Sequence, residues 1–250
     1  MQRYFLDDKS LKNGNKVVIQ GADHHHITRV MRMKLGDKLQ VVIASTPYLA
    51  AITAISDLQV EVEVLERMQD GSEAGIALTL LQGLPKGEKI DLIIRQAAEI
   101  GVAEIIVFQA ARSVAKIAGD KRESKLLRWR RIAKEAAELA HRTVIPEVKF
   151  ADSLKAAFSL MDSEALKLVP YELQNGGLPA LKEVLHRVAV PSSAAFVIGP
   201  EGGFAEEEVH LMEAAGGRLL TLGKRILRTE TAGLVVASLL LYEWDQMGVN

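Results

Sequence analysis

The chain has 250 residues, of which 48% are hydrophobic and 25% are charged, and its formal net charge is −1. This size allows one large domain or two modest ones with an ample core, and the near-neutral charge excludes a protein that binds nucleic acid over its whole surface. The absence of cysteine excludes disulfides, thiolate metal sites and cysteine nucleophiles. No apolar run approaches the roughly 20 residues of a membrane span, and Asp7 and Asp8 come too early for a signal peptide. We therefore expect a cytoplasmic protein with no membrane partner.

Short β-rich runs dominate the first seventy residues. Pro47 favours a turn between the later runs. Between Asp23 and Met33 the apolar spacing changes to that of one helical face. These features predict a small, mostly antiparallel β-barrel with a short helix across it. The predicted strands are Arg3–Leu6, Val17–Ile19, Lys38–Ile43 and Val60–Leu65.

Three adjacent histidines, His24 to His26, lie in the predicted helix. Residues at successive helical positions do not face each other, so the three rings cannot converge on one metal ion. His26, Arg29 and Arg32 are spaced three residues apart and drift slowly around one face. That edge could contact phosphate groups, and a solvated basic face explains the same pattern.

The small polar segment Gln69–Gly75 is the best candidate for a linker. After it, strands alternate with helices, which predicts an α/β domain with a parallel sheet flanked by helices. Gly101 is expected to end the first helix in the left-handed conformation. The predicted strands are Ile76–Gln82, Glu104–Phe108, Leu166–Pro170, Ala194–Ile198 and Arg218–Leu222. The predicted helices are Lys89–Ile100, Glu123–His141, Leu178–Arg187, Ala205–Ala215 and Thr231–Trp244.

A basic segment runs from Arg112 to Arg142. It contains ten Lys or Arg residues and only four Asp or Glu residues. A local basic patch on a neutral protein is typical of a specific anionic partner. A solvated helix face is the alternative.

Gly199-Pro200-Glu201-Gly202-Gly203 follows a predicted strand. Its glycines let a ligand approach the backbone closely, and loops at the carboxyl ends of parallel strands are where ligands bind. The next helix opens with Glu206, Glu207 and Glu208, which suit the helix dipole but would repel a phosphate. The loop therefore favours a ligand without phosphate.

A second loop, Leu222 to Ala232, places Arg225 and Arg228 beside Thr229-Glu230-Thr231. Either threonine is expected to cap the final helix, with Glu230 in its first turn. That helix is apolar nearly all round, which indicates burial on several sides and suits contact with a second subunit.

Together these two loops resemble the C-terminal signature of the SPOUT RNA methyltransferases. The chain is most similar to the family that methylates N3 of a uridine in the decoding region of 16S rRNA. It departs from that family's pattern at Glu138-Leu139-Ala140, where a Gln is usual, and at Ala205, where a capping Ser or Thr is usual. The resemblance covers nearly the whole chain and includes Arg3-Tyr4-Phe5, His26 to Arg32, Gly83-Leu84-Pro85-Lys86-Gly87, Gln109 to Ser113 and the pair Arg142 and Pro146.

The resemblance implies a PUA-like β-barrel over residues 1–70 and an α/β trefoil-knot (SPOUT) methyltransferase domain over residues 75–250, with helices on both faces of a parallel sheet. It also implies a homodimer, a 16S rRNA or small-subunit partner and an S-adenosyl-L-methionine (SAM) site. SAM carries no phosphate, in agreement with the acidic helix start. The residues expected to line the site are Tyr171, Gly199, Pro200, Glu201, Gly202, Gly203, Leu222, Gly223, Ile226, Leu227, Arg228 and Ala232.

Methylation of uracil N3 requires an unpaired or flipped-out base and loss of its N3 proton. Arg228 is the expected catalytic group, because a cation near O2 and O4 would stabilise the developing negative charge; an ion pair with Glu230 or with the cofactor carboxylate is the alternative. Glu201 is the candidate base, with backbone capping as its alternative. No metal is expected. The residues expected to bind RNA are Arg3, His26, Arg29, Arg32, Arg112 and Arg142.

Two other functions stay open. Another SPOUT enzyme could act on tRNA or on a ribose 2′-oxygen, and digestion of treated RNA to nucleosides would separate these. An RNA-binding ribosome-assembly factor could keep the fold without the cofactor, which calorimetry with SAM would test. A dehydrogenase is disfavoured because the chain lacks the dinucleotide fingerprint.

Overall fold

The structure, a computed structural model, describes residues 1–7, 11–12, 15–69, 71–172 and 177–247. The chain divides into two compact units. The first comprises Met1–Glu73 together with Ala137–Val144, and the second comprises Ala74–Ala136 and Ile145–Asn250. The return of residues 137–144 to the first unit has no signal in the sequence, because it depends on contacts with residues far away in the chain.

The first unit is built on a six-stranded sheet in the order β1-β4-β5-β6-β3-β2. All its pairs are antiparallel except β1 with β4, which confirms the mostly antiparallel prediction. A separate apolar core that includes Tyr4, Ile19 and Leu39 lies within this unit. Its strands are β1 (Arg3–Leu6), β2 (Leu11–Lys12), β3 (Lys16–Gln20), β4 (Lys38–Ile43), β5 (Thr46–Ile55) and β6 (Gln59–Arg67).

The prediction of a turn at Pro47 is wrong, because Pro47 lies in strand β5 opposite Val42. The turn falls earlier, at Ala44 and Ser45, whose φ angles of 47° and 57° are left-handed. Such hairpin turns usually contain Asn or Gly, so the residues here give no turn signal. Pro47 is tolerated because it is the second residue of the strand, where a missing N–H costs little.

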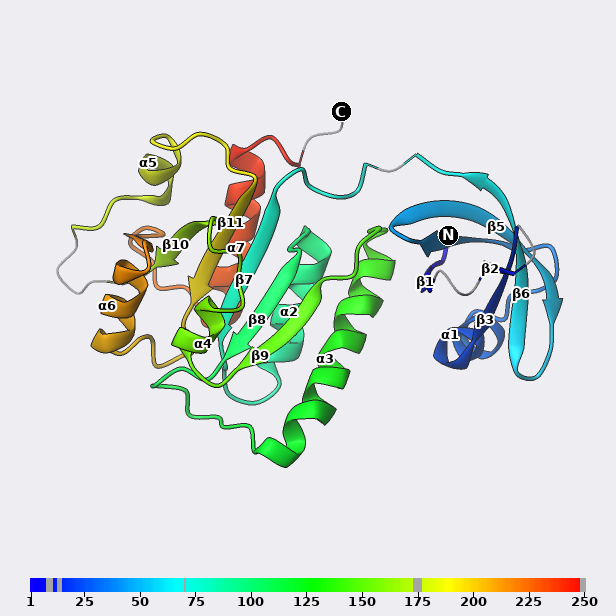
Figure 1. Cartoon of the computed structure of the whole chain (residues 1–250), viewed down its shortest axis with the longest axis horizontal. Helices are drawn as coiled ribbons and strands as arrows, with labels where there is room; N and C mark the ends of the chain where they lie inside the picture. Colours follow the sequence, from blue (N-terminus) through cyan, green and yellow to red (C-terminus); the bar gives the residue numbers. More distant parts are fainter. Residues whose placement is uncertain (8–10, 13–14, 70, 173–176, 248–250) are drawn as a thin grey trace. The chain divides into compact units, whose positions relative to one another are not determined.

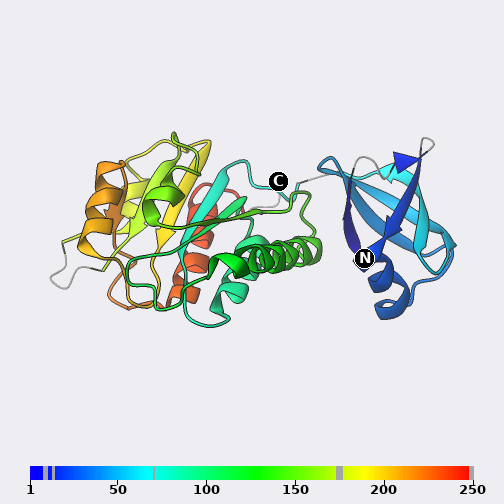
Figure 2. The same cartoon turned by 60° about the horizontal axis from the view of Figure 1, so that its bottom comes forward.

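The predicted helix of the first unit begins at Gly21 and has two parts, α1 (Gly21–His25) and the π-helical turn η2 (His26–Val30). Ile27 is fully buried in the core of this unit, so one apolar anchor holds the segment against the curled sheet (Figure 2). π-Helical turns are rare in proteins overall, and those that occur are often found at functional sites.

The second unit contains a parallel six-stranded sheet in the order β12-β10-β11-β7-β8-β9 (Figure 1). Its strands are β7 (Ala77–Gly83), β8 (Glu104–Phe108), β9 (Glu147–Ala151), β10 (Leu166–Pro170), β11 (Ser193–Ile198) and β12 (Arg218–Leu220). Its helices are α2 (Lys89–Ile100), α3 (Gly119–Leu139), α4 (Leu154–Phe158), α5 (Leu181–Leu185), α6 (Glu206–Ala214) and α7 (Thr229–Glu243). Gly101 ends α2 with a φ of 109°, as its position predicts.

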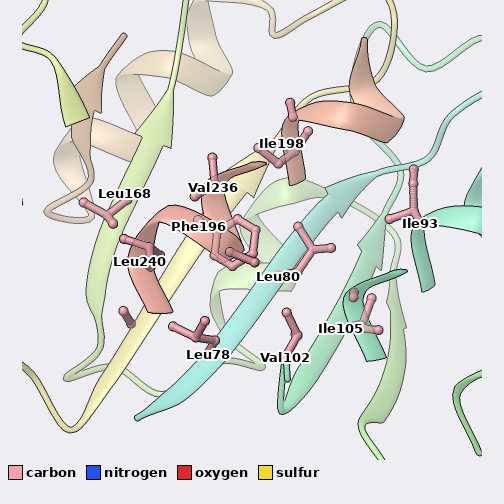
Figure 3. Packing of buried hydrophobic residues seen from close by; sticks show 14 of the residues in the cluster. Leu78, Leu80, Ile93, Val102, Ile105, Leu168, Phe196, Ile198, Val236 and Leu240 are labelled. Atoms are coloured by element: carbon pink, nitrogen blue, oxygen red, sulfur yellow. The ribbon is translucent and has the colours of Figure 1, made fainter. Parts of the chain in front are cut away.

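Two apolar clusters lie on opposite faces of this sheet. One cluster joins the sheet to α2, α3, α5 and α7, and Figure 3 shows Val236 and Leu240 of α7 beside Phe196 and Leu80. The other cluster joins it to α4 and α6. The predicted parallel sheet with helices on both faces is therefore confirmed. In the described part of the chain no helix combines the length and apolar character of a membrane span.

Several elements differ from their prediction. Strands β2, β5 and β9 and the short helix α4 were not predicted. Strand β5 contains Pro47, which favours a turn, Glu147–Ala151 mixes charged and apolar residues, and α4 has only five residues. Helix α3 begins at Gly119 rather than Glu123, and α5 keeps only the middle of its predicted range. The final helix begins at Thr229, two residues early.

Candidate functional site

Three neighbouring strands end in the loops that the sequence singled out. Strand β10 is followed by Tyr171, β11 by Gly199–Gly203, and β12 by the segment 222–228 that leads into α7. Since β12, β10 and β11 are adjacent and parallel, their carboxyl ends lie at one edge of the sheet, where α/β proteins bind ligands. The structure thus brings the predicted cofactor residues to one edge.

Close backbone packing fixes the loop after β11. A Cβ on Gly83, the last residue of β7, would lie 2.5 Å from Pro200 Cδ and 2.8 Å from Pro200 N. A Cβ on Gly202 would lie 3.0 Å from the Arg112 carbonyl oxygen, and Gly203 has a φ of 66°. The glycines are therefore required by contacts and by backbone conformation.

A hydrogen-bond chain connects this loop to α7. The Thr229 hydroxyl donates to the Gly199 carbonyl oxygen over 2.7 Å, and the Gln82 side-chain amide donates to that hydroxyl over 2.9 Å. The expected capping by Thr229 or Thr231 is wrong: Arg228 occupies the N-cap position without a side-chain cap, and Thr229 binds the neighbouring loop instead. Gln82 is fully buried, and its amide oxygen has no partner among the described groups.

Glu201 is held by an ion pair. Its carboxylate accepts a hydrogen bond from Lys89 Nζ at 2.8 Å and from the Lys86 backbone N–H at 3.2 Å. Partial burial favours the neutral form, but the bonds from Lys89 and the backbone outweigh it and keep the pKa of Glu201 below its usual value. A carboxylate held in this way is a weak base, so the geometry favours the alternative in which Glu201 binds backbone.

Glu230, in the first turn of α7 as predicted, shares the same ammonium. Its Oε2 lies 3.5 Å from Lys89 Nζ, whereas no ion pair joins it to Arg228 among the described residues. The Arg228 side chain is exposed and makes no hydrogen bond or ion pair in that part of the chain. The intramolecular alternative for Arg228 is therefore absent, and its guanidinium can meet a ligand. Lys89 is a site residue that sequence reasoning missed, because its partners lie 112 and 141 positions away.

The loop before α7 offers an apolar wall and a turn. Leu222 and Leu227 are half-buried against the core, and Ala232 is buried. Gly223 has a φ of 104° and its N–H bonds to the Thr221 hydroxyl over 3.1 Å. Ile226 is 79% exposed. An apolar wall beside a tight turn suits a planar heterocycle.

The acidic start of α6 disfavours phosphate here too. Glu206 and Glu207 are exposed, and Glu208 accepts hydrogen bonds from the backbone N–H groups of Ala111 and Ala205, both at 2.9 Å. The latter bond is the half of a capping box that the N3 glutamate provides, while Ala205 has no side-chain acceptor for the other half. These residues fit a ligand without phosphate, such as SAM.

In the first unit, Arg29 and Arg32 are exposed and His26 is half-buried. The Tyr4 hydroxyl lies 3.0 Å from His26 Nδ1. Burial, followed by the charges of Glu138 and Asp23, raises the pKa of Tyr4, so this hydroxyl stays protonated beside the imidazole. This contact orients the His26 ring through its Nδ1 atom.

Arg3 and Arg142 are both buried, with exposed fractions of 8% and 3%, and Arg142 belongs to the first unit rather than to the second. Arg3 donates to the Gln40 side chain over 2.9 Å and to the carbonyls of His141 and Arg142. Arg142 pairs with Glu73, with Nη2 to Oε2 at 2.7 Å. Because both guanidinium groups hold the first unit together, we do not propose them as RNA contacts.

Replacing Glu73 with alanine is expected to weaken the first unit by about 2 kcal/mol. Glu73 also accepts hydrogen bonds from the backbone N–H groups of Thr143 and Val144. The change therefore removes the carboxylate that pairs with the buried Arg142 and that binds these two N–H groups. Breaking a fully buried pair costs about 3–5 kcal/mol, but the Glu73 side chain keeps 23% exposure, which lowers the value. Amide exchange in β4 to β6 should become about 30-fold faster, while the exposed control Glu66→Ala should leave it unchanged. Equal exchange in both variants would contradict the structural role.

Arg112 is exposed and lies next to the loop after β11. Its Nη1 is 3.5 Å from the Gly202 carbonyl oxygen, at the limit of a hydrogen bond. A cavity of about 460 Å³ lies beside this segment, and its wall includes Gln109, Lys116, Lys155 and Glu207. Arg112 is therefore an exposed cation beside the loop after β11.

Comparisons with known proteins agree with this arrangement. A family model described as "RNA methyltransferase domain" matches residues 72–241, and one described as "RNA methyltransferase PUA domain" matches residues 19–65. The chain is 36% identical over 252 residues to "Ribosomal RNA small subunit methyltransferase E" of Bacillus subtilis, which covers 98% of both chains.

Two similar solved structures contain a ligand. One is a Ribosomal RNA small subunit methyltransferase E from Neisseria gonorrhoeae bound to S-adenosyl methionine, with 28% identity, a TM-score of 0.85 and 98% of each chain covered. The other is a putative methyltransferase from Legionella pneumophila in complex with bound SAM, with 27% identity and a TM-score of 0.84 over 96% of this chain and 97% of that one.

Proposed function

Since the chain belongs to the RNA methyltransferase family and carries that family's PUA domain, we propose that it transfers the methyl group of SAM to N3 of a uracil in 16S rRNA of the small ribosomal subunit. The observation that carries the reaction class is the meeting of three strand-end loops, fastened by the Thr229–Gly199 bond, over a site that disfavours phosphate. The curated relative from Bacillus subtilis supports the choice of small-subunit rRNA.

The residues that would hold the cofactor are those of the strand-end loops. Leu222 and Leu227 would flank the adenine, and the backbone of Gly199 to Gly203 would line the same pocket with Tyr171. When bound, SAM supplies a methyl group activated by its sulfonium. The protein's part is to hold that methyl group in line with N3, and alignment of this kind supplies a large share of many enzymatic rates.

Arg228 would stabilise the uracil ring of the substrate during methyl transfer. Loss of the N3 proton leaves negative charge on O2 and O4 of uracil, and an unpaired guanidinium stabilises such charge. The ion pair between Glu201 and Lys89 supports a structural role for Glu201, and the N3 proton would leave to solvent water.

The RNA would meet both units. We propose residues 1–70 as the RNA-binding domain, with His26, Arg29 and Arg32 on phosphates, and residues 75–250 as the methyltransferase domain, with Arg112 beside the site. We further propose a cytoplasmic homodimer and a trefoil knot formed by the segments after β11 and β12. Leu239 and Tyr242, which are 44% and 73% exposed on α7, support a second subunit on that helix.

One experiment tests the function directly. Small ribosomal subunits from cells that lack this protein would be incubated with it and with labelled SAM, and the label would be mapped to a nucleotide. We expect one methyl group per subunit, released on digestion as 3-methyluridine. A 2′-O-methylated nucleoside, or label in tRNA alone, would favour another SPOUT activity; failure to bind SAM would favour an assembly factor.

A further inference from the structure

The ammonium of Lys89 lies between two carboxylates that belong to different parts of the site. Lys89 is the first residue of α2, Glu201 lies in the loop after β11, and Glu230 lies in the first turn of α7. The distances from Lys89 Nζ are 2.8 Å to Glu201 Oε1 and 3.5 Å to Glu230 Oε2. One cation therefore connects the two loops that are proposed to hold SAM.

The two carboxylates need this cation. The Glu230 side chain is only 15% exposed, and its Oε2 is buried without a hydrogen-bond partner among the described residues. Without Lys89, two like charges would face each other at the boundary of the two loops, and separation of the loops would relieve their repulsion. The hydrogen bond that Lys89 donates to Glu201 raises the pKa of Lys89, so the ammonium remains charged throughout the neutral range.

We propose that Lys89 is a positioning residue that clasps the loop Gly199–Gly203 to the first turn of α7 and so preforms the methyl-donor site. This inference rests on the proposed function for the identity of the ligand. Lys89 acts through Glu201 and Glu230 and is not itself placed against the reacting atoms.

The clasp should matter more for binding than for stability. The side chains of Lys89 and Glu201 are 37% and 31% exposed, and exposed ion pairs contribute little to folding. Loop position, in contrast, controls whether a ligand finds its contacts already aligned. The Thr229–Gly199 hydrogen bond also connects the loop after β11 to the start of α7. Loss of Lys89 should therefore increase the mobility of these two segments without unfolding them.

The test measures SAM binding by calorimetry for the full chain and for Lys89→Met, Lys89→Arg and Arg95→Met. Lys89→Met keeps the hydrocarbon stem and removes the charge, whereas Arg95→Met removes one positive charge from the exposed side of the same helix. We expect Lys89→Met to weaken SAM binding about tenfold, the typical worth of a charge-assisted hydrogen bond. Lys89→Arg should restore most of the affinity, and Arg95→Met should leave it unchanged. At saturating SAM, kcat should change less than the affinity.

A second measurement needs no ligand. Amide exchange in residues 199–203 and 229–232 should be faster in ligand-free Lys89→Met than in the parent protein, and exchange in β7 and β8 should be unchanged. The double variant Lys89→Met/Glu201→Gln should lose less affinity than the sum of the two single losses. Equal SAM affinity and equal loop exchange in Lys89→Met and the parent would overturn the clasp, whereas a parent protein that does not bind SAM would overturn the proposed function itself.

Discussion

Replacement of Arg228 by alanine should lower kcat for methyl transfer by about 10²–10³-fold, the usual effect of losing one group that stabilises a developing oxyanion. The affinity for SAM should change by less than about tenfold. The reason is that Arg228 is exposed and makes no hydrogen bond or ion pair in the described part of the chain, while Glu230 is paired with Lys89 instead.

The control for this prediction is Arg225→Ala. Arg225 is an exposed arginine three positions earlier in the same loop, so its loss removes the same charge from the same surface. Single-turnover rates and SAM affinity should be measured for both variants. If turnover survives in Arg228→Ala, or if only SAM affinity falls, the catalytic assignment is removed and Arg228 becomes a contact for the cofactor. Arg228→Lys should recover little, because lysine lacks the planar fork of donors.

Elements with strong local periodicity could be predicted from the sequence. Helix α2 alternates buried and exposed positions at helical spacing and ends at Gly101, so both of its ends match the prediction. Strands β8 and β10 are short apolar runs with clear boundaries, and they match too. In each case the local signal agrees with the tertiary structure.

Features that depend on distant partners could not be predicted. Arg3 looks like a surface cation in the sequence, but it is buried because Gln40 and two carbonyls near His141 accept its donors. The turn at Ala44 and Ser45 was missed because neither residue usually adopts a left-handed conformation. Lys89 was missed for the same reason as Arg3, since its partners are brought to it only by the fold.

The candidate site likewise contains residues that the sequence indicates and residues that only the structure reveals. Its glycines and Arg228 stand out in the sequence because their residue types are unusual at the ends of predicted strands. Gln82 and Thr229 do not, because a glutamine at the end of a strand or a threonine at a helix start has many ordinary explanations. Only their distances, 2.9 Å between them and 2.7 Å from Thr229 to Gly199, show that they fasten the loops.

Gly83 contributes both to the packing of the second unit and to the position of the loop after β11. An alanine there would place its Cβ 2.5 Å from Pro200 Cδ, 2.8 Å from Pro200 N and 3.2 Å from Gly199 C. Two of these are backbone atoms, so no side-chain rotation relieves the clash. Either β7 or the loop after β11 must move, and Gly83 is paired with Phe108 within the sheet, so the loop is the part that yields.

We therefore expect Gly83→Ala to destabilise the second unit by about 3 kcal/mol, at the upper end for overpacking, and to weaken SAM binding about 10²-fold, since a misplacement of about 1 Å can have that effect. The matched control is Gly119→Ala, because a Cβ at Gly119 meets no atom within 4 Å and no left-handed φ is required there. Urea unfolding followed by tryptophan fluorescence reports the second unit alone, since Trp129 and Trp244 both lie in it, and calorimetry gives the affinity. A variant that loses stability but binds SAM as the parent does would mean that the loop after β11 does not contact the cofactor, whereas a loss of both places Gly83 beneath the methyl-donor site.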